Sequence, residues 1–248
     1  MEKQRRRGIY ILPNLFTTAA LFAGFYAIVQ AMNGEFELAP IAIFVAMVLD
    51  SLDGRVARWT HTESDFGAQY DSLADMVSFG LAPALIVYEW ALSPLGKLGW
   101  LAAFVYAAAA ALRLARFNVQ VGKIDSSFFR GLPSPSAAAV VVGLVWVAHS
   151  FGVPGKEMSI VALIFTVCAG AAMVSNIRYY SFKKFDMKGR VPFMAVLAVV
   201  LVFVLVSLDP PQVLFMIFLG YGLSGPLIAG VGQLRRVQQG KQARRGRL

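Results

Sequence analysis

The sequence has little of two things that soluble and secreted proteins use freely, namely charge and cysteine. Only 15% of its 248 residues are charged, and Cys168 is the single cysteine. A soluble domain has roughly a quarter of its residues charged, so this composition excludes an ordinary soluble domain. One cysteine builds neither a disulfide framework nor a cysteine-rich metal site, and we interpret Cys168 as a small apolar side chain within an apolar segment.

Long segments of alternating polar and apolar residues are also missing, which argues against a membrane β-barrel. The sequence does contain repeated apolar runs of about 20 residues, the length that crosses a bilayer core as a helix. Hydrophobic residues make up 58% of the chain, and the mean hydropathy is +0.63. The predicted fold class is therefore all-α, a polytopic membrane helix bundle formed by a single integral-membrane domain, residues 1–248.

The N-terminus has the basic head and apolar run of a signal peptide but no obvious small-residue cleavage site. We therefore expect a retained first span. About eight transmembrane helices are predicted, at 9–32, 36–58, 66–92, 97–119, 134–151, 157–178, 191–208 and 211–235. Turn and breaker residues separate them, as in Ser93-Pro94-Leu95-Gly96 and Asp209-Pro210-Pro211.

Lysine and arginine predict the orientation, because they favour the cytoplasmic side of a membrane. With the N-terminus in the cytoplasm, all 23 basic residues fall in cytoplasmic segments except Lys97 and Lys156. An even number of spans with both termini cytoplasmic accounts for this asymmetry. We therefore expect a multi-pass protein of the inner, cytoplasmic cell membrane, with residues 50–75 at its cytoplasmic side.

The net charge of +9 does not indicate a nucleic-acid-binding protein. The positive residues sit in short segments between spans, and no separate soluble domain is left to hold a duplex. The basic tails either fix the topology, which we favour, or attract anionic membrane lipids. Small residues at helix spacing, such as Gly225 with Ala229, predict close packing within the chain, with a homodimer face as the alternative.

Four aspartates interrupt the apolar pattern in the stretch DSLDGRVARWTHTESDFGAQYDSLAD, residues 50–75. Asp50 and Asp53 are three residues apart and share one face of the second helix. Asp71 and Asp75 are four residues apart and share one face of the third helix. The polar segment between the pairs turns the chain, so we expect antiparallel helices whose carboxylate pairs face each other near the cytoplasmic surface.

Such a cluster needs compensation, because one aspartate at a membrane helix centre costs about 2.5 to 3.5 kcal/mol and the four repel one another. An ion-pair network with Arg55 and Arg58 is one explanation, but it leaves negative charge over and does not account for two regular pairs. Two divalent cations account for both observations. Carboxylate oxygens favour Mg²⁺, Mn²⁺ or Ca²⁺ over zinc, and two-metal sites are common in enzymes that act on phosphate esters.

Small residues lie beside these aspartates. Gly54 and Ala57 are three apart and leave a smooth strip next to Asp53, where a flat group such as a nucleotide could approach. Glycine inside a helix costs about 1 kcal/mol relative to alanine, so either ligand approach or close helix packing should explain it. Arg58 follows as a cation able to bind phosphate with two hydrogen bonds. Gly67 is expected to let the second and third helices approach.

The spacing D-x2-D-G-x2-A-R-x8-G-x3-D-x3-D is filled here by Asp50, Asp53, Gly54, Ala57, Arg58, Gly67, Asp71 and Asp75. It resembles in full the signature of the CDP-alcohol phosphatidyltransferase family. The resemblance implies a membrane enzyme that displaces CMP from a CDP-linked lipid with an alcohol at a two-metal site. It implies that the four aspartates ligate the cations and that Asp75 is also the general base.

The same resemblance implies that Gly54, Ala57 and Arg58 contact the nucleotide and its phosphates. Asn14 and Thr17, at the cytoplasmic end of the first helix, are candidates for the same pocket. An ordinary polar helix start explains these two residues equally well.

Further segments are similar to the branch of this family that uses serine as the alcohol. They are PNLFTTAALFAGF (13–25), ALRLARFNV (111–119), FFRGLPSPSAAA (128–139) and SNIRYYSFK (175–183). The similarity extends over 9–185, the expected catalytic core, and leaves 191–235 as two additional C-terminal helices. It implies transfer of the phosphatidyl group of CDP-diacylglycerol to the hydroxyl of L-serine, giving phosphatidylserine and CMP.

Serine would bring a carboxylate and an ammonium group to the site. The candidates to bind them are Arg113, Arg116, Asn118, Asn176, Arg178 and, more weakly, Ser78. Anchoring of the topology explains each arginine equally well.

Alternatives within the family are other acceptors, namely glycerol 3-phosphate, an inositol phosphate or choline. Outside the family, a divalent-cation transporter also places aspartates in a membrane. A transporter needs ligands near the membrane midplane and a route to both sides. The aspartates are expected at one surface, beside Arg58 and a nucleotide-sized strip, which favours the enzyme.

Overall fold

The computed structural model describes residues 11–60, 62, 64–120, 128–180 and 193–245. Its uninterrupted α-helices are α1 (Ile11–Met32), α2 (Leu38–Thr60), α5 (Lys97–Gln120), α6 (Ser134–Ser150), α7 (Ser159–Val174), α8 (Phe193–Leu208) and α9 (Pro210–Arg245). The third helical segment is composite and consists of α3 (Asp65–Asp75), η2 (Met76–Leu81), α4 (Ala82–Val87), η3 (Tyr88–Leu92) and η4 (Ser93–Leu95). The short 3₁₀ helix η5 (Gly155–Met158) precedes α7, and the strands are β1 (Phe128–Arg130) and β2 (Arg178–Tyr180).

These elements confirm the predicted all-α membrane bundle. Within the described residues, five segments are long and apolar enough to cross a membrane: Pro13–Met32, Asp65–Leu95, Lys97–Val119, Gly155–Val174 and Pro210–Ala229. The apolar helices in α6 and α8 are shorter, and α2 carries Asp50, Asp53 and Arg55 in its second half. The chain is therefore a multi-pass membrane protein, while eight complete spans stay a prediction.

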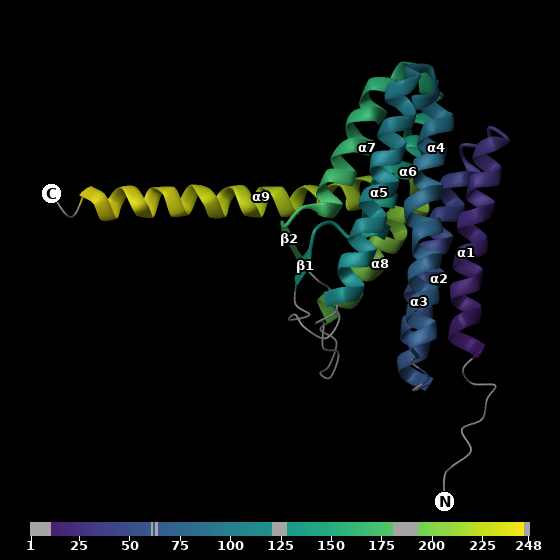
Figure 1. The fold of residues 1–248 in the computed structure, drawn as a ribbon, viewed down its shortest axis with the longest axis horizontal. Helices are drawn as coiled ribbons and strands as arrows, with labels where there is room; N and C mark the ends of the chain where they lie inside the picture. The colour runs from purple at the N-terminus through teal and green to yellow at the C-terminus, as the bar shows by residue number, and fades with distance from the viewer. Residues whose placement is uncertain (1–10, 61, 63, 121–127, 181–192, 246–248) are drawn as a thin grey trace, which may run out of the picture.

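The helices run side by side except at the C-terminus. Figure 1 shows α9 projecting from the bundle, crosswise to α1, α3 and α5. It ends at Arg245, beyond the expected end near residue 235, whereas α7 ends at Val174, short of the expected 178.

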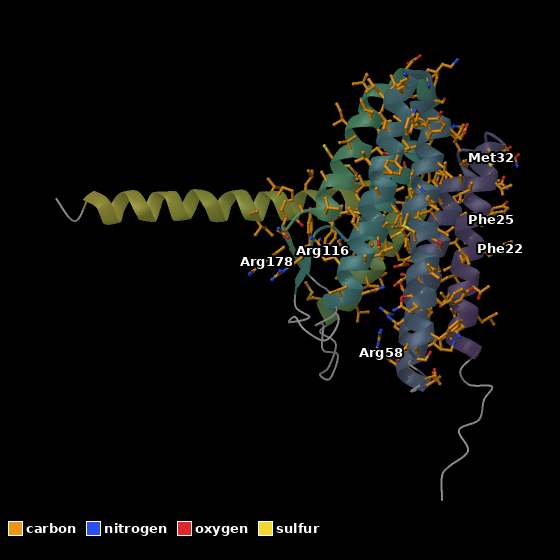
Figure 2. The ribbon with its side chains drawn as sticks, viewed as in Figure 1. Phe22, Phe25, Met32, Arg58, Arg116 and Arg178 are labelled. Carbon is orange, nitrogen blue, oxygen red and sulfur yellow. The ribbon has the colours of Figure 1, made fainter. Side chains whose placement is uncertain are left out.

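Small side chains fill the interior of the bundle. α6 is buried along nearly its whole length, from Ser134 to Ala148, and alanine is the commonest core residue among those described. Small residues let helices approach closely, which matters in a membrane because lipid tails are as apolar as the helices themselves. Large apolar side chains face outward, as Figure 2 shows for Phe22, Phe25 and Met32 on α1.

The third segment departs from a regular α-helix directly after Asp75. Residues Met76–Leu81 are π-helical, and the Ala82 N–H bonds the Val77 carbonyl, one residue further back than in an α-helix. Pro83 follows, and proline has no N–H to offer the preceding turn. Wide turns of this kind occur often at functional sites.

The two strands form a small antiparallel sheet with Arg130 opposite Arg178. The sequence analysis did not anticipate it, because strands of three residues carry no periodic pattern. Gly131 ends β1 with a φ of +81°, and a Cβ there would collide with the Met173 carbonyl oxygen. Glycine alone fits both the left-handed backbone and this close approach.

α9 docks against α6 and β2 through glycines. A Cβ on Gly143 of α6 would lie 3.1 Å from the Phe215 ring, and one on Gly225 would collide with the Tyr179 ring. The Tyr179 hydroxyl donates to the Gly222 carbonyl at 3.2 Å. The predicted close packing within the chain is therefore confirmed for Gly225.

Candidate active site

The polar cluster lies at one end of the bundle, where α2 ends and α3 begins. The Ser64 side chain caps α3 by accepting a hydrogen bond from the Gly67 N–H at 3.0 Å. Thr62 is buried, and its hydroxyl bonds that of Thr60 at 2.7 Å. These local bonds turn the chain, so that α3 runs back in the direction opposite to α2.

The four aspartates meet as two pairs, each with one member on α2 and one on α3. Oxygens of Asp50, Asp53 and Asp71 lie within 4.8 Å of one another. The Asp53 and Asp71 side chains are within hydrogen-bonding reach of each other, and so are those of Asp50 and Asp75. Antiparallel helices produce this pairing when each carries its acidic residues about one turn apart.

Asp53 is held from the first helix. It is only 6% exposed, and the buried Thr17 hydroxyl donates to its Oδ2 at 2.7 Å. Arg58, on the same helix as Asp53, attracts its carboxylate electrostatically. A hydrogen bond from a neighbouring side chain to a ligating carboxylate is the usual way in which proteins orient metal ligands.

The donor set fits a hard divalent cation. Among the described residues, Asp50, Asp53 and Asp71 can hold an ion between them, and Asp75 lies next to Asp50. Carboxylate oxygens suit Mg²⁺, Mn²⁺ and Ca²⁺, and a bound cation removes the repulsion between the clustered charges.

A cavity of about 460 Å³ opens beside these aspartates, and Asp53 and Asp71 are part of its wall. Its lining also includes all of the residues predicted to contact the nucleotide, namely Asn14, Thr17, Gly54, Ala57 and Arg58. Pockets for small molecules and cofactors measure about 300–1,000 Å³, so the cavity is large enough for a nucleotide.

Two glycines shape this cavity. A Cβ on Gly54 would lie 3.4 Å from Nη1 of Arg58, so the glycine leaves room for the guanidinium to fold over α2. A Cβ on Gly67 would lie 3.1 Å from Ser64 Oγ and 3.5 Å from Asn14 Oδ1. Gly67 therefore lets α3 approach α1, and the expectation that it serves contact with α2 was wrong, because the cavity lies between α2 and α3.

Arg113 reaches toward the aspartates from α5. It is 8% exposed, its Nη1 donates to Ser134 Oγ at 2.8 Å, and its buried Nε has no hydrogen-bond partner within the described residues. Electrostatic attraction links it to Asp75. A buried guanidinium with an unused donor is costly, so this arrangement suits a site that an anionic group completes.

The Arg116 guanidinium, in contrast, is hydrogen-bonded to backbone carbonyls. It donates to the carbonyls of Arg130 at 2.9 Å, Met173 at 3.1 Å, Val174 at 3.1 Å and Ser175 at 3.3 Å. The last carbonyls of a helix lack partners within it, and basic side chains commonly satisfy them. These bonds give a physical reason why α7 ends at Val174, and they give Arg116 a structural role, while its contact with serine stays a prediction.

Arg116 also joins the segments that resemble the serine-using branch of the family. It belongs to residues 111–119, and its carbonyl partners lie in 128–139, at the end of α7 and at the start of 175–183. Strand β1 belongs to 128–139 and strand β2 to 175–183, so their pairing connects these two segments. Stretches that are separate in the sequence therefore form one unit beside α5.

Asn118 and Ser78 have partners on other helices. The Asn118 amide donates to Ser72 Oγ at 3.0 Å, which ties α5 to the helix that carries Asp71. Ser78 is buried and donates to the Ala20 carbonyl at 3.1 Å, so it links α1 to η2, and its contact with serine stays a prediction.

The last two residues predicted to bind serine, Asn176 and Arg178, lie away from the aspartates. Asn176 and Arg178 are exposed, and Figure 2 shows Arg178 near Arg116 at the outer edge of the sheet. Their positions do not link them to the carboxylate cluster.

Sequence reasoning missed several residues around Arg113. Ser134, which lies within the segment 128–139, anchors it through a hydrogen bond. Tyr221 of α9 interacts electrostatically with it and packs against Tyr179, with ring centroids 5.7 Å apart. No sequence signal places Tyr221 there, because the contact depends on how α9 docks.

A membrane helix bundle with four clustered aspartates at one end and an adjoining cavity has the features of an integral-membrane enzyme that handles a phosphate-containing substrate. The chain belongs to the CDP-alcohol phosphatidyltransferase family, whose family model matches residues 10–173.

Several curated relatives carry the name CDP-diacylglycerol–serine O-phosphatidyltransferase. The one from Helicobacter pylori is 37% identical over 215 residues, 87% of this chain and 90% of the relative. The one from Bacillus subtilis is 34% identical over 173 residues, 70% of this chain and 92% of the relative. A third, from Mycobacterium tuberculosis, is 40% identical over 154 residues, 59% of this chain and 54% of the relative. The division into a core at 9–185 and two further helices at 191–235 stays a prediction.

Proposed function

We propose that this protein transfers the phosphatidyl group of CDP-diacylglycerol to the hydroxyl of L-serine, yielding phosphatidylserine and CMP. The observation that carries the proposal is the pairing of Asp50 with Asp75 and of Asp53 with Asp71 beside a nucleotide-sized cavity. Serine as the acceptor is supported by the names of relatives that are 34% to 40% identical to this chain.

The four aspartates would hold two divalent cations, and we propose Mg²⁺ or Mn²⁺. Such cations, when bound, neutralise charge on the pyrophosphate and lower the pKa of the attacking alcohol. The carboxylates supply only oxygen ligands, which is the preference of both ions.

The cavity would bind the cytidine diphosphate part of the lipid. Arg58 offers the phosphates a planar cation, and Gly54 and Ala57 leave an open surface against which the nucleotide can lie. Asn14 adds an amide at the opposite wall, contributed by α1. Thr17 lines the same cavity, and its hydroxyl also donates to Asp53.

Asp75 would act as the general base. In the transfer, the serine Oγ–phosphorus bond forms, the phosphorus–oxygen bond to CMP breaks, and the hydroxyl proton passes to the Asp75 carboxylate. Arg113, which attracts Asp75 from α5, would bind the serine carboxylate with its unused donor. The acceptor would then lie between α3 and α5.

We further propose that the site faces the cytoplasm of the inner membrane. Arg58 lies at the end of the bundle where α2 ends and α3 begins (Figure 2). Lys97 begins α5, directly after the far end of the composite helix that starts with α3, and Lys156 lies in η5 at the start of α7. Basic residues favour the cytoplasmic side, which supports this orientation.

The experiment is an acceptor panel with the purified protein. CDP-diacylglycerol and Mn²⁺ or Mg²⁺ are supplied with serine, glycerol 3-phosphate, inositol phosphate or choline in turn, and CMP release is measured. We expect release with serine. Release only with another acceptor would overturn the choice of serine, and metal uptake into proteoliposomes without CMP release would favour a transporter.

A further inference from the structure

The carbonyl of Phe79 lacks the donor that an α-helix would give it. In an α-helix the N–H four residues later bonds each carbonyl, and here that residue is Pro83, which has no N–H. Phe79 and Pro83 are both buried, so water does not replace the missing donor. Moving an unpaired carbonyl from water into a membrane interior costs several kcal/mol.

Tyr106 supplies the missing donor. Its hydroxyl, on α5, bonds the Phe79 carbonyl at 3.0 Å, and its side chain is fully buried. A Cβ on Gly170 of α7 would lie 3.4 Å from the Tyr106 Cα, so α7 packs closely behind it. Both the bond and the packing hold the tyrosine in one place.

The π-helical turn is held from two sides. On the α5 side, a Cβ on Gly80 would lie 3.2 Å from Ala110, one turn after Tyr106. On the α1 side, Ser78 donates to the Ala20 carbonyl at 3.1 Å. The turn held in this way begins at the residue that follows Asp75.

We propose that Tyr106 is a positioning residue for Asp75, because its hydroxyl stabilises the wide turn Met76–Leu81 that aims this carboxylate at Asp50. The inference rests on the proposed function for its catalytic consequence. Its structural part does not, because it concerns only the geometry of the carboxylate cluster.

The same face of α5 carries Tyr106 and, two turns later, Arg113. Arg113 interacts with Asp75 directly, whereas Tyr106 reaches it through the backbone of η2. Loss of the tyrosine hydroxyl takes this donor away from the Phe79 carbonyl, and the turn can then relax toward another hydrogen-bond pattern. Because a helix rotates by about 100° per residue, even a partial change of this pattern turns Asp75 away from Asp50.

The test is Tyr106→Phe, which removes only the hydroxyl. Thermal unfolding in detergent is followed while Mn²⁺ is titrated, and the Mn²⁺ concentration at half-maximal stabilisation is recorded together with CMP release. We expect this midpoint to rise roughly 10-fold, as for other residues that orient metal ligands, with a parallel loss of kcat. Tyr179→Phe is the matched control, because it removes another tyrosine–carbonyl bond. It should lower the unfolding temperature without moving the Mn²⁺ midpoint.

A second variant tests the route of the effect. Pro83→Ala gives residue 83 an N–H that the Phe79 carbonyl can accept, so Tyr106→Phe should shift the midpoint only about twofold in this background. An unmoved Mn²⁺ midpoint in Tyr106→Phe, or an equal shift with and without Pro83, would overturn the inference. The titration needs no acceptor, so failure of the wild type to use serine would contradict the proposed function and leave the inference to be decided by the midpoint.

Discussion

The hydroxyl of Thr17 on α1 donates a 2.7 Å hydrogen bond to Oδ2 of Asp53 on α2. α1 has no charged residue, yet it orients the most buried of the four aspartates. The Ala20 carbonyl of α1 also accepts a hydrogen bond from the Ser78 hydroxyl. One apolar helix therefore contacts both of the helical segments that carry the aspartates. The first helix is thus part of the site as well as a membrane span.

Thr17→Val removes this hydrogen bond while keeping the shape of the side chain. We expect the Mn²⁺ concentration for half-maximal activity to rise by about 10-fold, because the Asp53 carboxylate loses its orienting partner. Thr18→Val is the control, since the Thr18 hydroxyl bonds the Asn14 carbonyl and the Tyr70 hydroxyl and, among the described residues, no aspartate. Equal metal activation curves for Thr17→Val and the wild type would contradict this role.

Asp71→Asn and Asp75→Asn test the carboxylate cluster itself. At saturating Mn²⁺, CMP release should fall at least about 100-fold, the usual contribution of a general base or more. Without metal the unfolding temperature should not fall, because each variant relieves repulsion between like charges. Asp209→Asn, whose side chain accepts the Gln212 N–H at the start of α9, should retain activity. A cluster variant with near-normal turnover would refute the assigned roles.

Arg113→Gln tests the contact with the acceptor. The KM for serine should rise roughly 10- to 100-fold, the value of one or two hydrogen bonds to a charged group, while the KM for CDP-diacylglycerol changes little. Ser134→Ala should raise the KM for serine less, because it removes only the anchor of the guanidinium. The opposite pattern, a rise in the KM for CDP-diacylglycerol alone, would indicate that Arg113 contacts the lipid substrate instead of serine.

Arg116→Lys tests the junction of α7 with the sheet. A lysine cannot bond four carbonyls at once, so the free energy of unfolding should fall by about 2 kcal/mol or more. Chemical denaturation in detergent measures this change. Arg55→Lys, at an exposed position of α2, should leave stability unchanged. If both variants are equally stable, the carbonyl contacts of Arg116 contribute nothing measurable.

Much of the fold follows from local pattern. Apolar runs of bilayer length predict helices, because a backbone in lipid must bond to itself, and breaker residues separate them at nearly the observed ends. The end of α7 was misplaced because the partners of Arg116 are up to 59 residues away in sequence. The two-stranded sheet was missed for a similar reason, since each strand is stabilised by its partner rather than by its own sequence.

By itself, the sequence determined which residues form the carboxylate cluster and which small residues lie beside it. Both depend on spacing along single helices, and the cost of burying charge explains why such residues need a function. The tertiary structure alone decided which arginine faces Asp75, which helix Gly67 meets and which hydroxyl completes the turn after Asp75. These outcomes depend on how separate helices pack, because a donor such as Tyr106 finds its acceptor only when the bundle brings the two together.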